Sequence, residues 1–197
     1  KFKNTKLINL DFIKKCKKYL NQNCKIIFLS SVSVYGNYKS IYSTEKKKVE
    51  IYLIKNFANV AIIYSGLILN KNYGSYKRLK NLNNFFKIPF YFGKYFYLLS
   101  TKEKDLVNIF YVKLIRFKKG KYFVYNRNEI YLDQFIKKRL KMFVFRFKLN
   151  HFITIKILKF LNYLNHLIFE SKFFDDLQNF FGDNPWNIII EEKKQKN

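Results

Sequence analysis

A tyrosine, a lysine and two serines are spaced so that they could transfer protons. Ser30 and Ser31 end a short apolar run, residues 26–29, of the kind that fills buried parallel strands. A helix-like segment then carries Tyr42 and Lys46 four residues apart, which places both on one face. A lysine ammonium one turn away favours the phenolate and lowers a tyrosine pKa that is ordinarily about 10. The spacing therefore predicts a proton-transfer site at the end of a strand.

The context of Tyr42 matters more than the YxxxK spacing itself. The chain has 16 tyrosines and is rich in lysine, so the spacing recurs by chance, and it starts at Tyr35, Tyr42, Tyr73 and Tyr76. Only Tyr42 has a strand ending in serines upstream and a helix-compatible segment around it. We therefore take Tyr42 and Lys46 as the candidate pair.

This stretch resembles the extended, NAD-dependent epimerase/dehydratase branch of the short-chain dehydrogenase/reductase superfamily. There, an SSxxVYG segment precedes YxxxK and a glutamate four residues further on; here these are residues 30–36, Tyr42, Lys46 and Glu50. By its offset, Ser31 matches the family's catalytic serine. The resemblance implies that Tyr42 exchanges a proton with a sugar oxygen, Ser31 hydrogen-bonds that oxygen and Lys46 holds the nicotinamide ribose. Glu50 is expected to support lysines on its own helix.

A second segment, residues 64–70, resembles the family's RPGxVYG. Leu67 stands where dehydratases and epimerases often have asparagine, which favours a reductase-like or divergent member. The resemblance implies NAD or NADP as the cofactor, and the expected cofactor contacts are Tyr42, Lys46, Ser65 and Gly66.

The implied substrate is a nucleotide-activated sugar, converted by epimerisation, dehydration or keto-reduction, as in the synthesis of surface polysaccharides. Basic side chains at residues 77–80 could bind its diphosphate, since guanidinium and ammonium groups complement phosphate. A solvated helix face is the alternative in so basic a chain. The expected substrate contacts are Ser31, Ser33 and Arg78.

The patterns along the chain favour an α/β fold, a partial Rossmann-like parallel sheet flanked by helices with a smaller, mostly helical substrate lobe. Residues 1–110 would form the dinucleotide-binding part and residues 111–197 the lobe, interleaved with residues 70–99. Residues 4–20 predict an amphipathic helix whose apolar positions are Leu7, Leu10, Ile13 (with Phe12) and Leu20.

Further elements are expected downstream. Residues 59–63 and 122–126 read as strands, residues 131–140 as a basic amphipathic helix, and residues 100–106 as a strand-to-helix junction with Asp105 as the helix cap. Residues 141–169 are apolar and basic, a pattern that fits helix core with lysine stems lying over it.

The formal charge of +26 would ordinarily suggest nucleic acid or an anionic membrane as a partner. The excess is almost all lysine, in a chain also rich in Asn, Ile, Tyr and Phe, which is typical of A/T-rich coding. We therefore expect no specific nucleic-acid partner. Two histidines and two cysteines without ligand spacing predict no metal site, and no apolar run is long enough to cross a bilayer. These observations favour the cytoplasm.

The sequence contains no GxGxxG turn. In the resembled family this turn lies upstream of the segment with which the chain begins, so we expect that part of the fold to be missing. Two alternatives stay open: a truncated, non-catalytic relic of the family, and a basic module that binds nucleic acid or a membrane surface. A homodimer through the Tyr42 helix is also expected from the resemblance.

Overall fold

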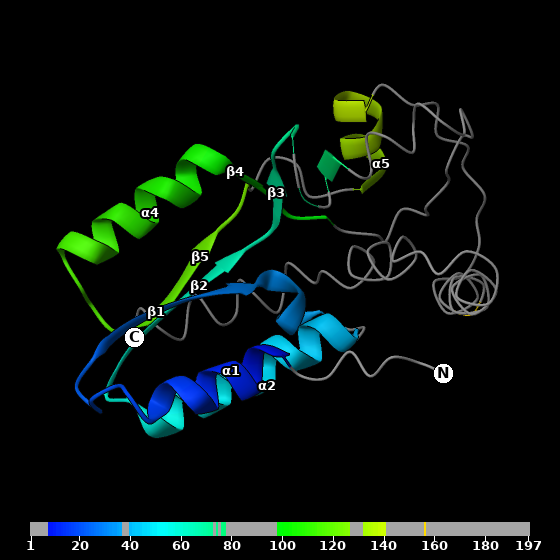
Figure 1. Ribbon diagram of the computed structural model, residues 1–197. Helices are drawn as coiled ribbons and strands as arrows, with labels where there is room; N and C mark the ends of the chain where they lie inside the picture. Colours follow the sequence, from blue (N-terminus) through cyan, green and yellow to red (C-terminus); the bar gives the residue numbers. More distant parts are fainter. Residues whose placement is uncertain are drawn as a thin grey trace.

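The computed structural model describes residues 8–36, 40–72, 74, 76–77, 98–126, 132–140 and 156. The elements follow in the order α1 (Ile8–Lys17), β1 (Lys25–Ser31), the 3-10 turn η1 (Val32–Tyr35), α2 (Ile41–Asn56), β2 (Asn59–Ser65), β3 (Leu67–Leu69), β4 (Ser100–Lys102), α4 (Glu103–Ile115), β5 (Gly120–Val124), α5 (Leu132–Phe135) and the π-helical turn η2 (Ile136–Leu140). Figure 1 shows their arrangement.

Three parallel strands form the main sheet, in the order β1-β2-β5. β1 pairs with β2 along its whole length, from Lys25 opposite Asn59 to Ser31 opposite Ser65. β3 and β4 form a second parallel pair (Figure 1). Because β1 and β2 are parallel and in register, their carboxyl ends lie at the same edge of the sheet.

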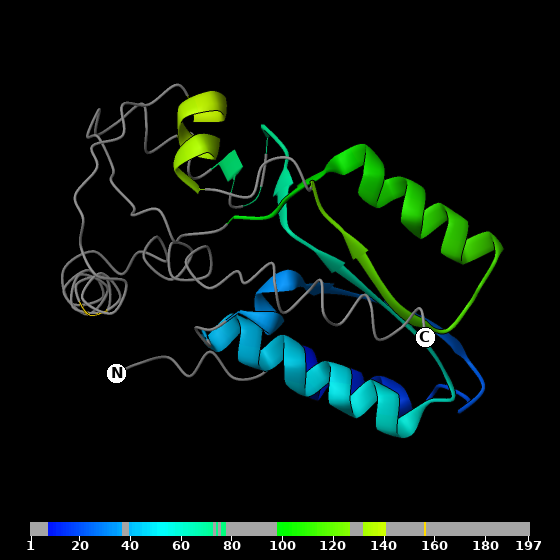
Figure 2. The same cartoon turned by 180° about the vertical axis from the view of Figure 1, so that it is seen from behind.

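Helices cover both sides of this sheet. α1 and α2 lie side by side against one face, and α4 lies on the opposite side, beside β5 (Figure 1, Figure 2). Parallel strands need such crossovers, and α2 supplies the one between β1 and β2. The arrangement confirms the predicted α/β class, with a parallel sheet flanked by helices.

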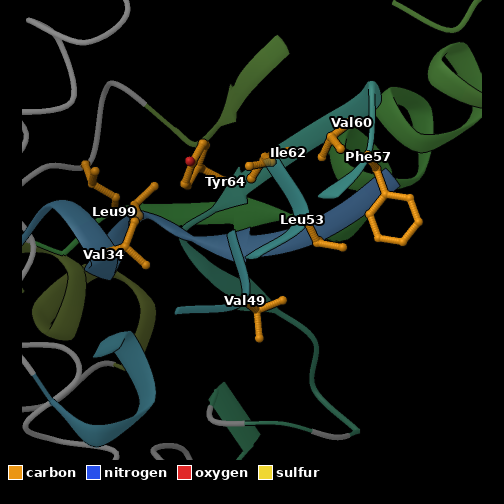
Figure 3. Packing of buried hydrophobic residues seen from close by; sticks show 9 residues of the cluster. Val34, Val49, Leu53, Phe57, Val60, Ile62, Tyr64 and Leu99 are labelled. Carbon is orange, nitrogen blue, oxygen red and sulfur yellow. The ribbon is translucent and has the colours of Figure 1, made fainter. Parts of the chain in front are cut away.

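The core is built around β2, which is covered on both faces. Val60, Ile62 and Tyr64 belong to one buried cluster with Leu53 of α2 (Figure 3). The intervening Ile63 is equally buried, and it points to the opposite face because successive side chains alternate along a strand. β2 is therefore apolar on both sides, as its sequence predicts for residues 59–63.

α2 has clear signals at both ends. Ser40 Oγ accepts a hydrogen bond from the Ser43 N–H at 3.1 Å, which satisfies a backbone donor that has no partner within the helix. Val49 and Leu53 lie one turn apart and are buried against the sheet. The helix ends at Asn56, and its C-cap residue Phe57 donates its N–H to the Leu53 carbonyl at 3.0 Å and places its ring in the core.

Three sequence expectations are wrong in detail. Phe12 is 62% exposed, because α1 packs on the core through Leu10 and Ile13, and Leu20 is also exposed, beyond the end of α1. Asp105 does not cap α4; it lies in the first turn, and the cap position is Lys102.

The apolar run of β1 is only partly buried, although its sequence predicts a buried strand. Among the described residues, β1 has a neighbouring strand on one side only, β2. A strand at the edge of a sheet keeps part of its surface uncovered, and this explains the difference.

The predicted strand at residues 122–126 and the predicted helix at residues 131–140 correspond to β5 and to α5 with η2. Most of residues 70–99 and 127–197, including the segment 141–169, lie outside the described residues. The division of the chain into a dinucleotide-binding part and a substrate lobe therefore stays a prediction.

Replacing Leu53 by alanine should lower the free energy of unfolding by about 2–5 kcal/mol, because it deletes a fully buried side chain from the cluster. Its helix neighbour Ile54 is 55% exposed, so Ile54→Ala is a matched control with an expected change of about 0.5 kcal/mol or less. Denaturant unfolding followed by circular dichroism measures both variants. Equal losses would contradict the placement of Leu53.

Candidate functional site

The candidate site lies where β1 and β2 end. Ser31 and Ser65 are the last residues of the two strands and pair with each other in register. α2 begins at Ile41, a few residues after η1, and η1 directly follows the end of β1. In open parallel sheets, ligands bind outside the carboxyl ends of the strands. The fold therefore brings the predicted serine, tyrosine and lysine to the edge where such ligands bind.

The Ser31 hydroxyl is oriented by its own turn. Its Oγ accepts from the Ser33 N–H at 3.2 Å and from the Ser33 hydroxyl at 2.9 Å. Ser31 is half-buried, whereas Ser33 is buried. Because Ser31 Oγ is the acceptor in both bonds, its proton can be donated to another oxygen. Ser33, predicted to touch the substrate, directs its hydroxyl to Ser31.

Tyr42 and Lys46 lie together on α2. The Lys46 ammonium is 5.7 Å from the centre of the Tyr42 ring and 4.9 Å from that of Phe28. It also donates a hydrogen bond to the Leu29 carbonyl of β1 at 2.9 Å. Tyr42 as a whole is 44% exposed. The predicted tyrosine–lysine pair is thus formed at the surface of the helix, next to β1.

Burial changes the pKa of the Lys46 ammonium. Desolvation lowers the pKa of its ammonium below the ordinary lysine value, and the negative charge of Glu50 acts against this by raising it. The Leu29 carbonyl and two aromatic rings surround the charge.

Glu50 is the site residue whose role the sequence did not reveal. Its side chain is 1% exposed, and its carboxylate accepts hydrogen bonds from the Ser30 hydroxyl, from Tyr64 Oη at 3.0 Å and from Lys47 Nζ at 3.2 Å. Support of a lysine on its own helix is confirmed for Lys47. The bonds to β1 and β2 were not foreseen. A carboxylate next to Val49, on the apolar face of α2, was the signal that could have found them.

Tyr64 is a buried hydrogen-bond donor beneath the site. Burial raises the pKa of its phenol, and the charge of Glu50 raises it further, so Tyr64 stays protonated. Its ring stacks on Phe123, with centroids 4.8 Å apart, and meets Tyr35 edge-on at 5.1 Å. These contacts fix the hydroxyl that Glu50 accepts.

The predicted contacts at residues 65, 66 and 78 are placed as follows. Ser65 is buried, and its hydroxyl donates to the Ser30 carbonyl at 3.4 Å. Gly66 lies against β4: its N–H bonds Thr101 Oγ1 at 2.8 Å, and a Cβ there would be 2.1 Å from the Leu99 carbonyl oxygen. Arg78 lies outside the described residues. Ser65 and Gly66 thus lie at the junction between the three-stranded sheet and the β3–β4 pair, and their contact with a cofactor remains a prediction.

Two features are absent from the part of the chain that the structure describes. No group of histidine, cysteine and carboxylate side chains there is arranged to hold a metal ion. No helix among these residues has the length and apolar character needed to span a membrane.

Comparisons with known proteins give likeness in structure only. Neither the family models nor the curated proteins contain a match to the sequence. A dTDP-4-dehydrorhamnose reductase from Bacillus anthracis, solved in complex with NADP, is 17% identical, with a TM-score of 0.48 over 62% of this chain and 50% of that one. A dTDP-4-dehydrorhamnose reductase from Clostridium acetobutylicum is 13% identical, with a TM-score of 0.49 over 63% and 50%. The chain thus spans about half the length of each.

Proposed function

We propose that this chain carries the proton-transfer site of an NAD(P)-dependent enzyme that acts on a nucleotide-activated sugar. The observation that supports it is the position of Lys46 beside the Tyr42 ring, at the strand edge where Ser31 ends β1. Reduction of a carbonyl needs a hydroxyl that can donate a hydrogen bond and a phenol next to an ammonium. Oxidation of an alcohol needs the same groups.

In this proposal each residue has a separate task. Tyr42 gives a proton to the substrate oxygen in reduction and takes it back in oxidation. Ser31 donates a hydrogen bond to the same oxygen, using the proton that its bonds with Ser33 leave available. Lys46 favours the phenolate state of Tyr42 through its charge.

The nicotinamide cofactor would supply the hydride. The Tyr42 hydroxyl and the Lys46 ammonium are donors suited to the hydroxyl groups of its ribose, and both lie at the carboxyl end of the sheet. NAD and NADP are both compatible with these two donors.

Keto-reduction is the reaction we favour among the three that the resemblance implies. Leu67 is buried in β3, at the position where epimerases and dehydratases often use an asparagine to hold the sugar. A buried leucine supplies no hydrogen bond to a substrate. This supports a reductase over the two alternatives.

The test is an assay of the complete gene product with NADH and NADPH and a panel of nucleotide-activated keto sugars. The expected result is saturable binding of one cofactor and loss of its reduced-nicotinamide absorbance when the correct sugar is present. Absence of both, in a protein that is folded by circular dichroism, would favour the non-catalytic relic.

Lys46→Met should weaken the binding of the nicotinamide cofactor about 10- to 100-fold, because it removes a charged hydrogen-bond donor. Methionine keeps a side chain of similar length. Lys48→Met is the matched control, since Lys48 is exposed on the same helix. Fluorescence titration with the reduced cofactor measures both. Equal affinities in the two variants would remove Lys46 from the cofactor site.

The homodimer expected through the Tyr42 helix is part of the same proposal. α2 exposes Ile51 and Ile54, and α1 exposes Phe12, so apolar side chains are available on this layer of helices. Sedimentation equilibrium of the complete gene product measures the oligomeric state.

A further inference from the structure

Glu50 is a carboxylate buried in the apolar face of a helix. Its neighbours on that face, Val49 and Leu53, belong to the hydrophobic cluster. An ionised carboxylate is costly to bury unless hydrogen bonds and charges compensate for the lost water. Three donors surround this one, and they come from three elements: Ser30 from β1, Tyr64 from β2 and Lys47 from α2.

The two hydroxyl donors lie at the ends of the strands that form the site. Ser30 precedes the last residue of β1, and Tyr64 precedes the last residue of β2. Tyr64 is held by its stacking on Phe123 and its edge contact with Tyr35, so it offers a fixed point of attachment. One carboxylate therefore ties α2 to both strand ends at once.

The residues that depend on this attachment are those of the proposed catalytic pair. Lys46 is one turn and Tyr42 two turns before Glu50, on the same face of α2. A rotation or shift of the helix about Glu50 would move both side chains relative to Ser31. We propose that Glu50 is a positioning residue, whose buried carboxylate fixes the Tyr42–Lys46 face of α2 against the carboxyl ends of β1 and β2. This inference rests on the function proposed above.

The charge of Glu50 also reaches Lys46, since it raises a pKa that burial lowers. The other titratable groups packed around this network are Tyr42 and Lys47 of α2, Tyr35 of η1 and Tyr64 of β2. Neighbouring α1 packs against this core through the apolar Leu10 and Ile13.

The first test uses Glu50→Gln, which keeps the volume and an acceptor for Ser30 but removes the charge. Acylation of Lys46 across a pH series, followed by mass spectrometry, reports its titration in the whole chain without any need for turnover. We expect the Lys46 midpoint to move to lower pH in Glu50→Gln. Glu45→Gln, one residue before Lys46 on the same helix, should leave the midpoint unchanged. An unchanged midpoint in Glu50→Gln, or an equal change in Glu45→Gln, overturns the proposal.

The second test uses Tyr64→Phe, which removes one donor to Glu50 and leaves every charge in place. In the complete gene product we expect kcat to fall about 10- to 100-fold, because the reacting groups are displaced relative to one another. An unchanged kcat overturns the positioning role. If the wild type shows no cofactor-dependent turnover, the proposed function fails, and the Lys46 titration decides the role of Glu50 by itself.

Discussion

Tyr42→Phe should reduce turnover of the complete gene product about 10²- to 10⁴-fold, the loss that accompanies removal of a general acid–base group. The substitution deletes one oxygen and retains the ring beside which the Lys46 ammonium lies. Because Tyr42 is 44% exposed, the free energy of unfolding should change by about 0.5 kcal/mol or less. Steady-state kinetics and denaturant unfolding of the same preparation separate the two effects.

Tyr19→Phe provides the matched control for this prediction. Tyr19 is 88% exposed, lies after the end of α1 and belongs to no contact of the site. Its loss of a hydroxyl should leave kcat and KM unchanged. If Tyr42→Phe were as active as Tyr19→Phe, the acid–base role would have to be assigned to another group.

Gly66→Ala should lower the free energy of unfolding by about 3 kcal/mol or more, the upper range for an overpacked interior. A Cβ at this position would be 2.1 Å from the Leu99 carbonyl oxygen and 2.5 Å from its carbon, both backbone atoms that no rotamer change can move. Next to this contact the Leu67 N–H bonds the Leu99 carbonyl at 2.7 Å, so separating the strands would also lengthen a ladder hydrogen bond.

Gly74→Ala distinguishes the steric cost from the general cost of replacing glycine. Gly74 has a φ of 76°, and no atom lies within 4 Å of a Cβ built there. Its replacement should cost about 1–2 kcal/mol, from backbone conformation alone. Thermal or denaturant unfolding of both variants is the measurement, and a loss for Gly66→Ala no greater than that for Gly74→Ala would contradict the close contact with Leu99.

Much of the fold could be predicted because its signals are local. In the strand predicted at residues 59–63, the apolar residues 60–63 are buried on both faces, and this run indicates a strand without further information. The helix that carries Tyr42 follows from its spacing, and Ser40 marks its start. The expectation for Phe12 is wrong because the covered side of α1 depends on where α2 lies, and short-range periodicity does not contain that information. The expectations for Leu20 and Asp105 are wrong because α1 ends at Lys17 and α4 begins at Glu103, and the pattern does not specify these exact bounds.

The part of the candidate site that depends on local spacing could also be predicted, whereas the part that depends on long-range contacts could not. Tyr42 and Lys46 are one turn apart, so a helix alone brings them together. The bonds of Glu50 to Ser30 and Tyr64 join residues 20 and 14 positions away in the sequence. They arise only when two strands and a helix are assembled, and the tyrosine that completes them replaces the arginine usual in the resembled family.

The start of α2 immediately after Ser40 also affects the electrostatic potential at Tyr42. Peptide dipoles aligned along a helix leave a partial positive charge at its first turn. Tyr42 is the second residue of α2, and the first turn contains no acidic side chain that would neutralise this charge. A phenolate formed there would be stabilised by the helix backbone itself, by about 0.3–1 kcal/mol, in addition to the attraction from Lys46.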